Sequence, residues 1–326
     1  VTAGDTRRLR VFALALLIAL LGTQALVLAG LFDASATTYV PAALPLLSVA
    51  LGSVIFGVGM ALVGTCGFGS LIRLGGGDLR SLVVVIVFGA VAYASLRGVL
   101  VDFRLNALEA VQVPVPNGAR GEWGALAGAG PTGRLFVTLL FAAPLAWWVF
   151  SDRRLARTPR LVAAGAALGF GVLAGWVLTG VLIDDFAAPR PQSLTFVGPM
   201  AKALFGLLAG TGELAEFGVA SVFGVAAGSW LAATRADQFR WEAFDDPREM
   251  RRHLLGATLM GFGGVAAGGC TIGQGLTAGS LLALTWPVAV AGLVLGARLG
   301  IFFVLEGRLA DALRDTLPRL FRRTDP

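Results

Sequence analysis

The chain has 326 residues, of which 56% are hydrophobic and only 14% charged, and its mean hydropathy is +0.79. These values lie outside the range of soluble globular domains, and several charge-free runs reach the roughly 20 residues that cross a bilayer. The net charge of +6 does not indicate nucleic-acid binding, because the arginines stand in short loops between apolar runs and no basic groove with interleaved aromatic residues is present. We therefore expect an all-α, polytopic protein with a single transmembrane domain spanning residues 1–326.

The first half of the chain alternates apolar runs with charged turns. Arg7, Arg8 and Arg10 precede the first run and favour a cytoplasmic N-terminus. Residues 97–134 contain prolines and an Asn-Gly pair, which predict an external loop with one short helix. The spans expected in this half are 11–32, a long segment at 41–72 that breaks around residue 66, 81–96 and 135–150.

The second half begins after four arginines in residues 151–160, which mark the middle of the chain as cytoplasmic and separate halves of about 1–155 and 156–326. Residues 192–212 are weakly apolar and predict a re-entrant or interfacial stretch, and residues 235–252 predict a basic inner loop. A short helix is expected after residue 270, and the arginine-rich C-terminal tail predicts a second cytoplasmic terminus. The spans expected here are 161–183, 217–234, 254–269 and 286–305, which brings the total to about eight to nine spans plus re-entrant or short helices.

One glycine-rich motif occurs twice. Residues 57–69 read GVGMALVGTCGFG and residues 261–273 read GFGGVAAGGCTIG, at a constant offset of 204 residues (from 66 to 270). The only two cysteines, Cys66 and Cys270, align with each other, and the repeated regions extend over 57–81 and 261–281. The first motif follows a span predicted to run inward and the second follows one predicted to run outward. We therefore expect an inverted repeat, although one miscounted span would make the repeat parallel.

The glycines around both cysteines would destabilise continuous helices. Non-helical backbone at membrane depth survives only when buried in protein or lining a cavity, and the broken helix ends expose amides that bind anions. A thiol is a weak hydrogen-bond partner but makes soft contacts with sulfur. Both features also have a purely structural interpretation: a single Gly-x-Gly allows close helix packing, and a cysteine can be a small buried hydrophobic residue. The residues expected to line a path for a small sulfur-containing anion are Cys66, Cys270, Gly64, Gly67, Gly69, Gly268, Gly269, Gly273 and Gln274.

Charged residues beside the first motif leave two alternatives open. Arg73, Asp78 and Arg80 either gather anions at the inner mouth of the path or pair with one another as a turn.

Other polar residues carry weaker signals. Glu213 and Glu216 flank the re-entrant stretch that holds the only lysine, Lys202, and intramembrane carboxylates usually mark function, but a loop end is at least as compatible. His253 stands beside two arginines and is expected to be interfacial rather than catalytic. The sequence contains no metal-ligand cluster, P-loop or nucleophile–base pair, so we expect neither an enzyme nor a resident cofactor.

Four stretches resemble the YeeE/YedE family of membrane proteins: 64–81 (GTCGFGSLIRLGGGDLRS), 193–199 (SLTFVGP), 217–224 (FGVASVFG) and 259–277 (LMGFGGVAAGGCTIGQGLT). The resemblance covers most of the chain. It implies uptake of thiosulfate, or of another sulfur or selenium species, across a bacterial inner membrane, through two pseudo-symmetric halves that pinch the membrane into an hourglass. It also implies membrane lipid and a cytoplasmic TusA-like sulfurtransferase as partners. The thiosulfate transporters of the family carry a further cysteine along the path, and this chain does not.

A different class of function is a membrane thiol-redox relay between the two cysteines. It requires Cα atoms within about 7 Å and an accessible thiolate of low pKa. Apolar, glycine-framed surroundings favour the neutral thiol, and neither cysteine belongs to a Cys-x-x-Cys pair. A purely structural membrane component, with both cysteines in its core, is the third alternative.

Overall fold

The computed structural model describes residues 6–115, 121–126, 130–152, 155, 157–182, 190–210, 214 and 216–306. Within these ranges the regular secondary structure is almost entirely helical, and seven stretches are long and apolar enough to cross a membrane. The prediction of an all-α polytopic membrane protein is thereby confirmed. The seven stretches are α1 (Arg7–Leu28), α2 and α3 together (Leu46–Val63 and Gly67–Gly75), α4 (Leu79–Arg97), α7 (Pro131–Phe150), α9 (Pro159–Gly180), α11 (Phe217–Arg235) and α13 (Trp286–Glu306).

The remaining expected span, 254–269, is a helix that begins earlier than predicted. Helix α12 (Pro247–Ala266) starts where the Asp246 side chain accepts a hydrogen bond from the Arg248 amide, with Pro247 in the first turn. An acidic N-cap and a proline at the first position start a helix whatever charges follow. The predicted inner loop at 235–252 is therefore wrong in its last part, and the charges in the first turns leave α12 outside the seven apolar stretches.

Shorter elements fill the connections. Helix α10 (Val197–Ala209) has 13 residues, too few to span a bilayer, as the predicted re-entrant stretch requires. The loop at 97–134 holds more structure than the single short helix expected there, including a two-residue antiparallel strand pair. The further elements are η1 (Ala34–Ala36), β1 (Ala43–Leu44), α5 (Val101–Phe103), η2 (Arg104–Leu108), β2 (Val113–Pro114), α6 (Trp123–Leu126) and η5 (Gly273–Ala278), the last being the short helix predicted after Cys270.

The chain forms two compact units. The first contains Val1–Leu44, Gln112–Leu194 and Ile272–Pro287, and the second contains Pro45–Val111, Thr195–Thr271 and Val288–Pro326. Each unit takes segments from both halves of the sequence, so the halves 1–155 and 156–326 remain a prediction about which segments are equivalent.

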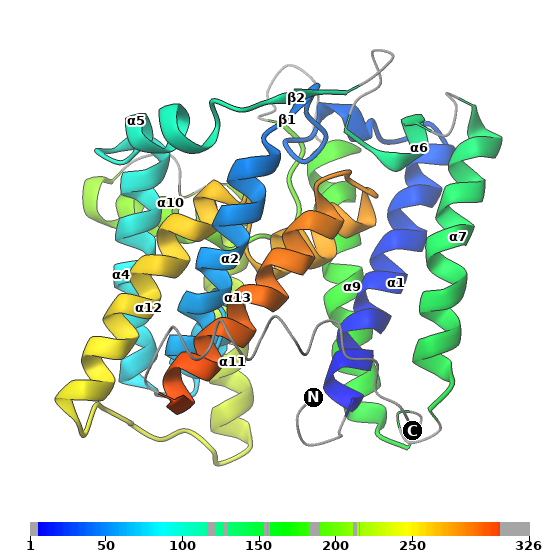
Figure 1. Cartoon of the computed structure of the whole chain (residues 1–326). Coiled ribbons are helices and arrows are strands. Elements are labelled where there is room, and N and C mark those ends of the chain that lie inside the picture. Colours follow the sequence, from blue (N-terminus) through cyan, green and yellow to red (C-terminus); the bar gives the residue numbers. More distant parts are fainter. Residues whose placement is uncertain are drawn as a thin grey trace. The chain divides into compact units, whose positions relative to one another are not determined.

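In the first unit, α1 packs against both α7 and α9 (Figure 1). Glycines on α9 bring its backbone close to α1: a β-carbon on Gly165 would lie 2.8 Å from the Val11 carbonyl oxygen, and one on Gly169 would lie 2.7 Å from that of Ala15. Close approach of this kind is how helices associate in a membrane, where burial of apolar surface supplies no driving force. Leucines on the other side of α1 join a buried cluster of Leu17, Leu20, Val137, Ala142 and Leu282.

The same unit contains buried polar side chains that bond to one another. Arg134 forms an ion pair with Glu122, which is 6% exposed, and its guanidinium approaches the Gln24 side chain at 3.5 Å. The Gln24 amide donates to the Ser280 carbonyl at 3.0 Å, and the Trp176 indole donates to the Ser280 hydroxyl at 3.2 Å. Such bonds offset the cost of burying polar groups.

In the core of the second unit α2 crosses α12, and each helix contacts the other through equivalent residues. A β-carbon on Gly59 would lie 2.5 Å from the Gly256 carbonyl oxygen, and one on Gly263 would lie 2.7 Å from that of Gly52. The offset of 204 residues converts 59 into 263 and 52 into 256, so the two contacts are equivalent. Residues early in one helix contact residues late in the other, and the two helices are therefore antiparallel.

The neighbours of these two helices extend the equivalence. A β-carbon on Gly57 of α2 would lie 2.5 Å from the Leu293 carbonyl oxygen of α13, and one on Gly261 of α12 would lie 2.8 Å from the Phe88 carbonyl oxygen of α4. The unit thus contains the series α4, α12, α2, α13, in which each helix packs against the next (Figure 1). Equivalent antiparallel helices in reciprocal contact are related by a two-fold axis perpendicular to them, which is the geometry of an inverted repeat.

Candidate functional site

The first motif interrupts the chain between α2 and α3. Gly64 ends α2 in a left-handed conformation (φ +80°), which glycine adopts without steric cost, and its amide donates to the Met60 carbonyl at 2.9 Å. Cys66 is extended and immediately precedes α3, which begins at Gly67. The predicted break at the cysteine is present.

The second motif interrupts the chain in the same way. Gly268, the equivalent of Gly64, is also left-handed (φ +73°) and follows the end of α12. The Gly269 amide donates to the Gly264 carbonyl at 2.9 Å, and Cys270 is buried at 1% exposed. Gly273 and Gln274 are buried in η5, which belongs to the first unit, whereas Cys270 belongs to the second.

Both cysteines belong to the second unit. Neither forms a disulfide bond, and each stands two residues after a left-handed glycine, Gly64 or Gly268. Thr271 reaches α2, where its hydroxyl lies 3.7 Å from the Met60 sulfur. Backbone amides of Phe68 and Gly69 face the Cys66 sulfur at the start of α3, although none completes a normal hydrogen bond to it.

Ser70 is not among the residues predicted to line the path. This residue is fully buried, and its hydroxyl has no hydrogen-bond partner within the part of the chain that the structure describes. Its amide donates to the Cys66 carbonyl at 2.9 Å, so it stands one helical turn beyond the thiol. The Cys-x-x-x-Ser spacing was a usable signal, because residues four apart share one helix face.

The glycines of the first motif differ in how tightly they are packed. A β-carbon on Gly69 would lie 2.0 Å from the Thr65 hydroxyl oxygen, whereas one on Gly67 would lie 3.5 Å from the Phe88 ring, at ordinary contact distance. A β-carbon on Gly64 would meet nothing within 4 Å, so its constraint is conformational. Of the three glycines nearest Cys66, Gly69 is the one where glycine is required for space.

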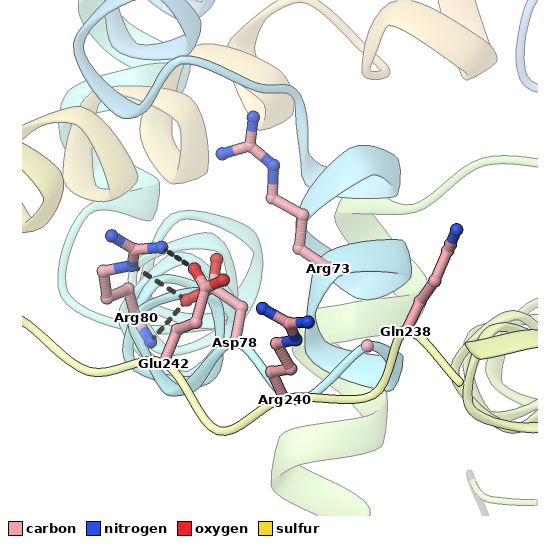
Figure 2. A pocket seen from close by; sticks show the side chains of 7 residues that line it. Arg73, Asp78, Arg80, Gln238, Arg240 and Glu242 are labelled. Carbon is pink, nitrogen blue, oxygen red and sulfur yellow. Dashed lines mark hydrogen bonds and ion pairs between the residues drawn. The ribbon is translucent and has the colours of Figure 1, made fainter. Parts of the chain in front are cut away.

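A cavity of about 380 Å³ lies at the far end of α3 (Figure 2). Its lining combines three arginines with two carboxylates and an amide: Arg73, Gly76, Asp78, Arg80, Gln238, Arg240 and Glu242. Arg80 forms ion pairs with Asp78 at 3.0 Å, with Glu249 at 3.6 Å and with Glu242. The structure therefore pairs Asp78 with Arg80, and it does not bring Arg73 into that group.

The charge of Asp78 is stabilised by its neighbours. Burial acts to raise the pKa of this carboxyl, but hydrogen bonds from Arg80 and Ser81 and the Arg80 charge outweigh it, so its pKa lies below the ordinary value of 3.8. The same side chain accepts a hydrogen bond from the Arg80 amide and caps α4. Asp78 thus has a structural role.

The remaining charged candidates also have partners. Glu216 accepts two hydrogen bonds from the Lys202 ammonium, at 2.7 and 2.8 Å, and Glu213 lies outside the described residues. The His253 Nδ1 lies 2.9 Å from the Glu249 carbonyl oxygen, and its ring packs edge-on against Phe244. Among the described residues, no three histidine, cysteine or acidic side chains gather in a way that would hold a metal ion.

Comparison with known proteins identifies the family of this chain. The family model described as sulphur transport matches residues 1–299. A protein of Escherichia coli strain K12 named thiosulfate transporter TsuA is 28% identical over 305 residues, covering 86% of this chain and 81% of its own. A protein of the same name from Spirochaeta thermophila is 27% identical over 263 residues, covering 78% and 77%. With its membrane helices and its doubled cysteine motif, the chain belongs to the sulphur-transport family, the YeeE/YedE family of membrane proteins.

Proposed function

We propose that this protein is a permease or channel that takes up a small sulfur-containing anion, with thiosulfate as the first choice of substrate. Cys66 and Cys270, with the glycine-rich breaks beside them, line the path. The observation that carries the proposal is that one unit contains two equivalent cysteines, each two residues after a left-handed glycine at an equivalent helix break. The relatives named thiosulfate transporter support the choice of substrate.

The chemistry of the first motif suits a permeating anion. Backbone amides at the start of α3 carry partial positive charge and face the Cys66 sulfur. A neutral thiol adds soft contact with a sulfur atom, which sulfate lacks at its surface. The Ser70 hydroxyl is available to donate a hydrogen bond to an oxygen of the anion. These contacts are individually weak, as conduction requires, because a permeating ion must also leave.

The transport test uses purified protein in proteoliposomes and labelled thiosulfate, sulfate and selenite. We expect thiosulfate to enter faster than sulfate, and Cys66→Ala and Cys270→Ala to abolish that uptake while the protein still inserts. Cys66→Ser is the matched variant, because serine keeps the approximate size of the side chain and its hydrogen-bond donor but lacks the sulfur atom. Its uptake of thiosulfate should also be slow. Equal uptake rates for thiosulfate and sulfate would contradict a role for the thiols. Uptake of selenite faster than that of thiosulfate would contradict thiosulfate as the substrate.

The presence of two equivalent thiols in one unit also favours one other candidate, a membrane thiol-redox relay. That function predicts a shift in gel mobility on oxidation, lost in either cysteine variant, and no anion uptake. In the transport proposal the protein lies in a bacterial inner membrane with cytoplasmic termini, and a TusA-like sulfurtransferase receives the cargo. Crosslinking to such a sulfurtransferase in inverted membrane vesicles tests both the cytoplasmic position of the termini and the delivery of the cargo to this partner.

A further inference from the structure

Two arginines of the cavity at the end of α3 have no acidic partner in the described part of the chain. Within the cavity lining, the carboxylates of Asp78 and Glu242 are turned toward Arg80, whereas Arg73 and Arg240 extend separately from α3 and from the loop before α12 (Figure 2). Among the residues that the structure describes, Arg73 makes a single long hydrogen bond, at 3.4 Å to the Gly64 carbonyl, and the Arg240 side chain makes none. The positive charge of the cavity is thus concentrated on these two side chains.

The backbone holds Arg240 at this place. Its amide donates to the Gly76 carbonyl at 3.1 Å, the Glu242 amide donates to the Gly77 carbonyl at 3.2 Å, and the Leu79 amide donates to the Glu242 carbonyl at 2.8 Å. Gly77 is left-handed (φ +100°), and a β-carbon there would lie 2.3 Å from the Arg240 carbonyl oxygen. These backbone hydrogen bonds join the loop to the glycine turn in one wall of the cavity, and Arg80 forms ion pairs with Asp78 and Glu242 at its other edge.

The cavity is connected to the first motif through Arg73. This residue lies in the last turn of α3, whose first turn follows Cys66, and its guanidinium reaches back to the carbonyl that ends α2. One side chain therefore extends from the cavity wall to the break at the cysteine.

We propose that Arg73 and Arg240, two arginines of this cavity, bind a small tetrahedral dianion such as thiosulfate or sulfate. This site rests on the proposed function and deepens it, because it gathers the anion beside the Cys66 break. Guanidinium groups bind oxyanions through charge-assisted, often bidentate, hydrogen bonds to oxygen. Since thiosulfate and sulfate share their oxygens and their charge, this site selects dianions and leaves discrimination of sulfur to the thiols.

Binding is measured by titrating purified, detergent-solubilised protein with thiosulfate or sulfate at low ionic strength in a calorimeter. We expect both dianions to bind with similar affinity, and Arg73→Gln and Arg240→Gln each to weaken binding about tenfold or more. Added sodium chloride should weaken it further because the site is open to solvent. Arg235→Gln is the matched control: it removes an exposed arginine at the end of α11 and should leave the affinity unchanged.

The outcomes separate this site from the transport proposal. Cys66→Ala should bind both dianions normally, because the arginine site does not use the thiol. If the arginine variants keep the same unfolding midpoint and also bind as tightly as wild type or Arg235→Gln, the site is wrong, whatever the uptake measurements show. If binding depends on the arginines but the wild-type protein carries no thiosulfate in proteoliposomes, the site stands and the transport proposal fails.

Discussion

Placing a methyl group where α2 and α12 cross should destabilise the protein by a predictable amount. In Gly59→Ala the new β-carbon would lie 2.5 Å from the Gly256 carbonyl oxygen and 2.8 Å from the Met260 amide nitrogen. Both atoms belong to the backbone, so no rotamer change relieves the clash, and the helices must separate by roughly 1 Å. Overpacking of this kind costs about 1–3 kcal/mol of the free energy of unfolding.

The reciprocal geometry of the crossing makes the prediction sharper. Gly263→Ala should cost a similar amount, because its β-carbon would lie 2.6 Å from the Phe56 amide nitrogen and 2.7 Å from the Gly52 carbonyl oxygen. A separation that relieves one clash also relieves the other. The double variant should therefore be more stable than the sum of the single losses implies, with a coupling energy of roughly 1 kcal/mol.

The assay is denaturant unfolding in detergent micelles of the wild type, both single variants and the double variant. Gly228→Ala on α11 is the control, because its β-carbon would meet nothing within 4 Å and alanine favours a helix over glycine. Strictly additive losses would refute the reciprocal contact, and single variants as stable as wild type would refute the close crossing itself.

Three further predictions concern single sites. Gly69→Ala should lower the free energy of unfolding by about 1–3 kcal/mol, because its β-carbon would lie 2.0 Å from the Thr65 hydroxyl oxygen. Gly67→Ala should be tolerated, and adding Thr65→Ala to the Gly69 variant should restore its free energy of unfolding. The lowered pKa of Asp78 contributes stability that is present above pH 3.8 and is lost as the pH falls below it. In Asp78→Asn the free energy of unfolding should therefore depend less on pH below pH 3.8. At Glu122 the sign is opposite: burial raises its pKa above 4.5 despite Arg134, so stability should fall as the pH rises from 4.5 toward the raised pKa. Glu122→Gln should remove that slope from an unfolding series, and an unchanged slope would contradict the burial of the carboxyl.

Much of the architecture was predictable because the signals are local. Apolar runs of membrane length determine where a chain can cross a bilayer, and seven of the predicted spans match helices of the described chain. The breaks at the two motifs follow from glycine chemistry, since Gly64 and Gly268 adopt the left-handed conformation that ends a helix. The family was predicted from the same residues, and the match over residues 1–299 confirms it. Asp246 and Pro247 also signal the early start of α12, but the arginines that follow them are equally typical of an inner loop.

By itself, the sequence determined the membrane class, the equivalence of two motifs 204 residues apart, and the two cysteines at their centres. It could not show that Gly59 meets Gly256 while Gly263 meets Gly52, and that pairing is what makes the two helices antiparallel. Nor could it distinguish Arg80, engaged by carboxylates, from Arg73 and Arg240, because a loop far along the chain supplies both Glu242 and Arg240. Spacing along a helix is a local property, whereas the partner of a charge or a glycine is decided by which distant segment folds against it.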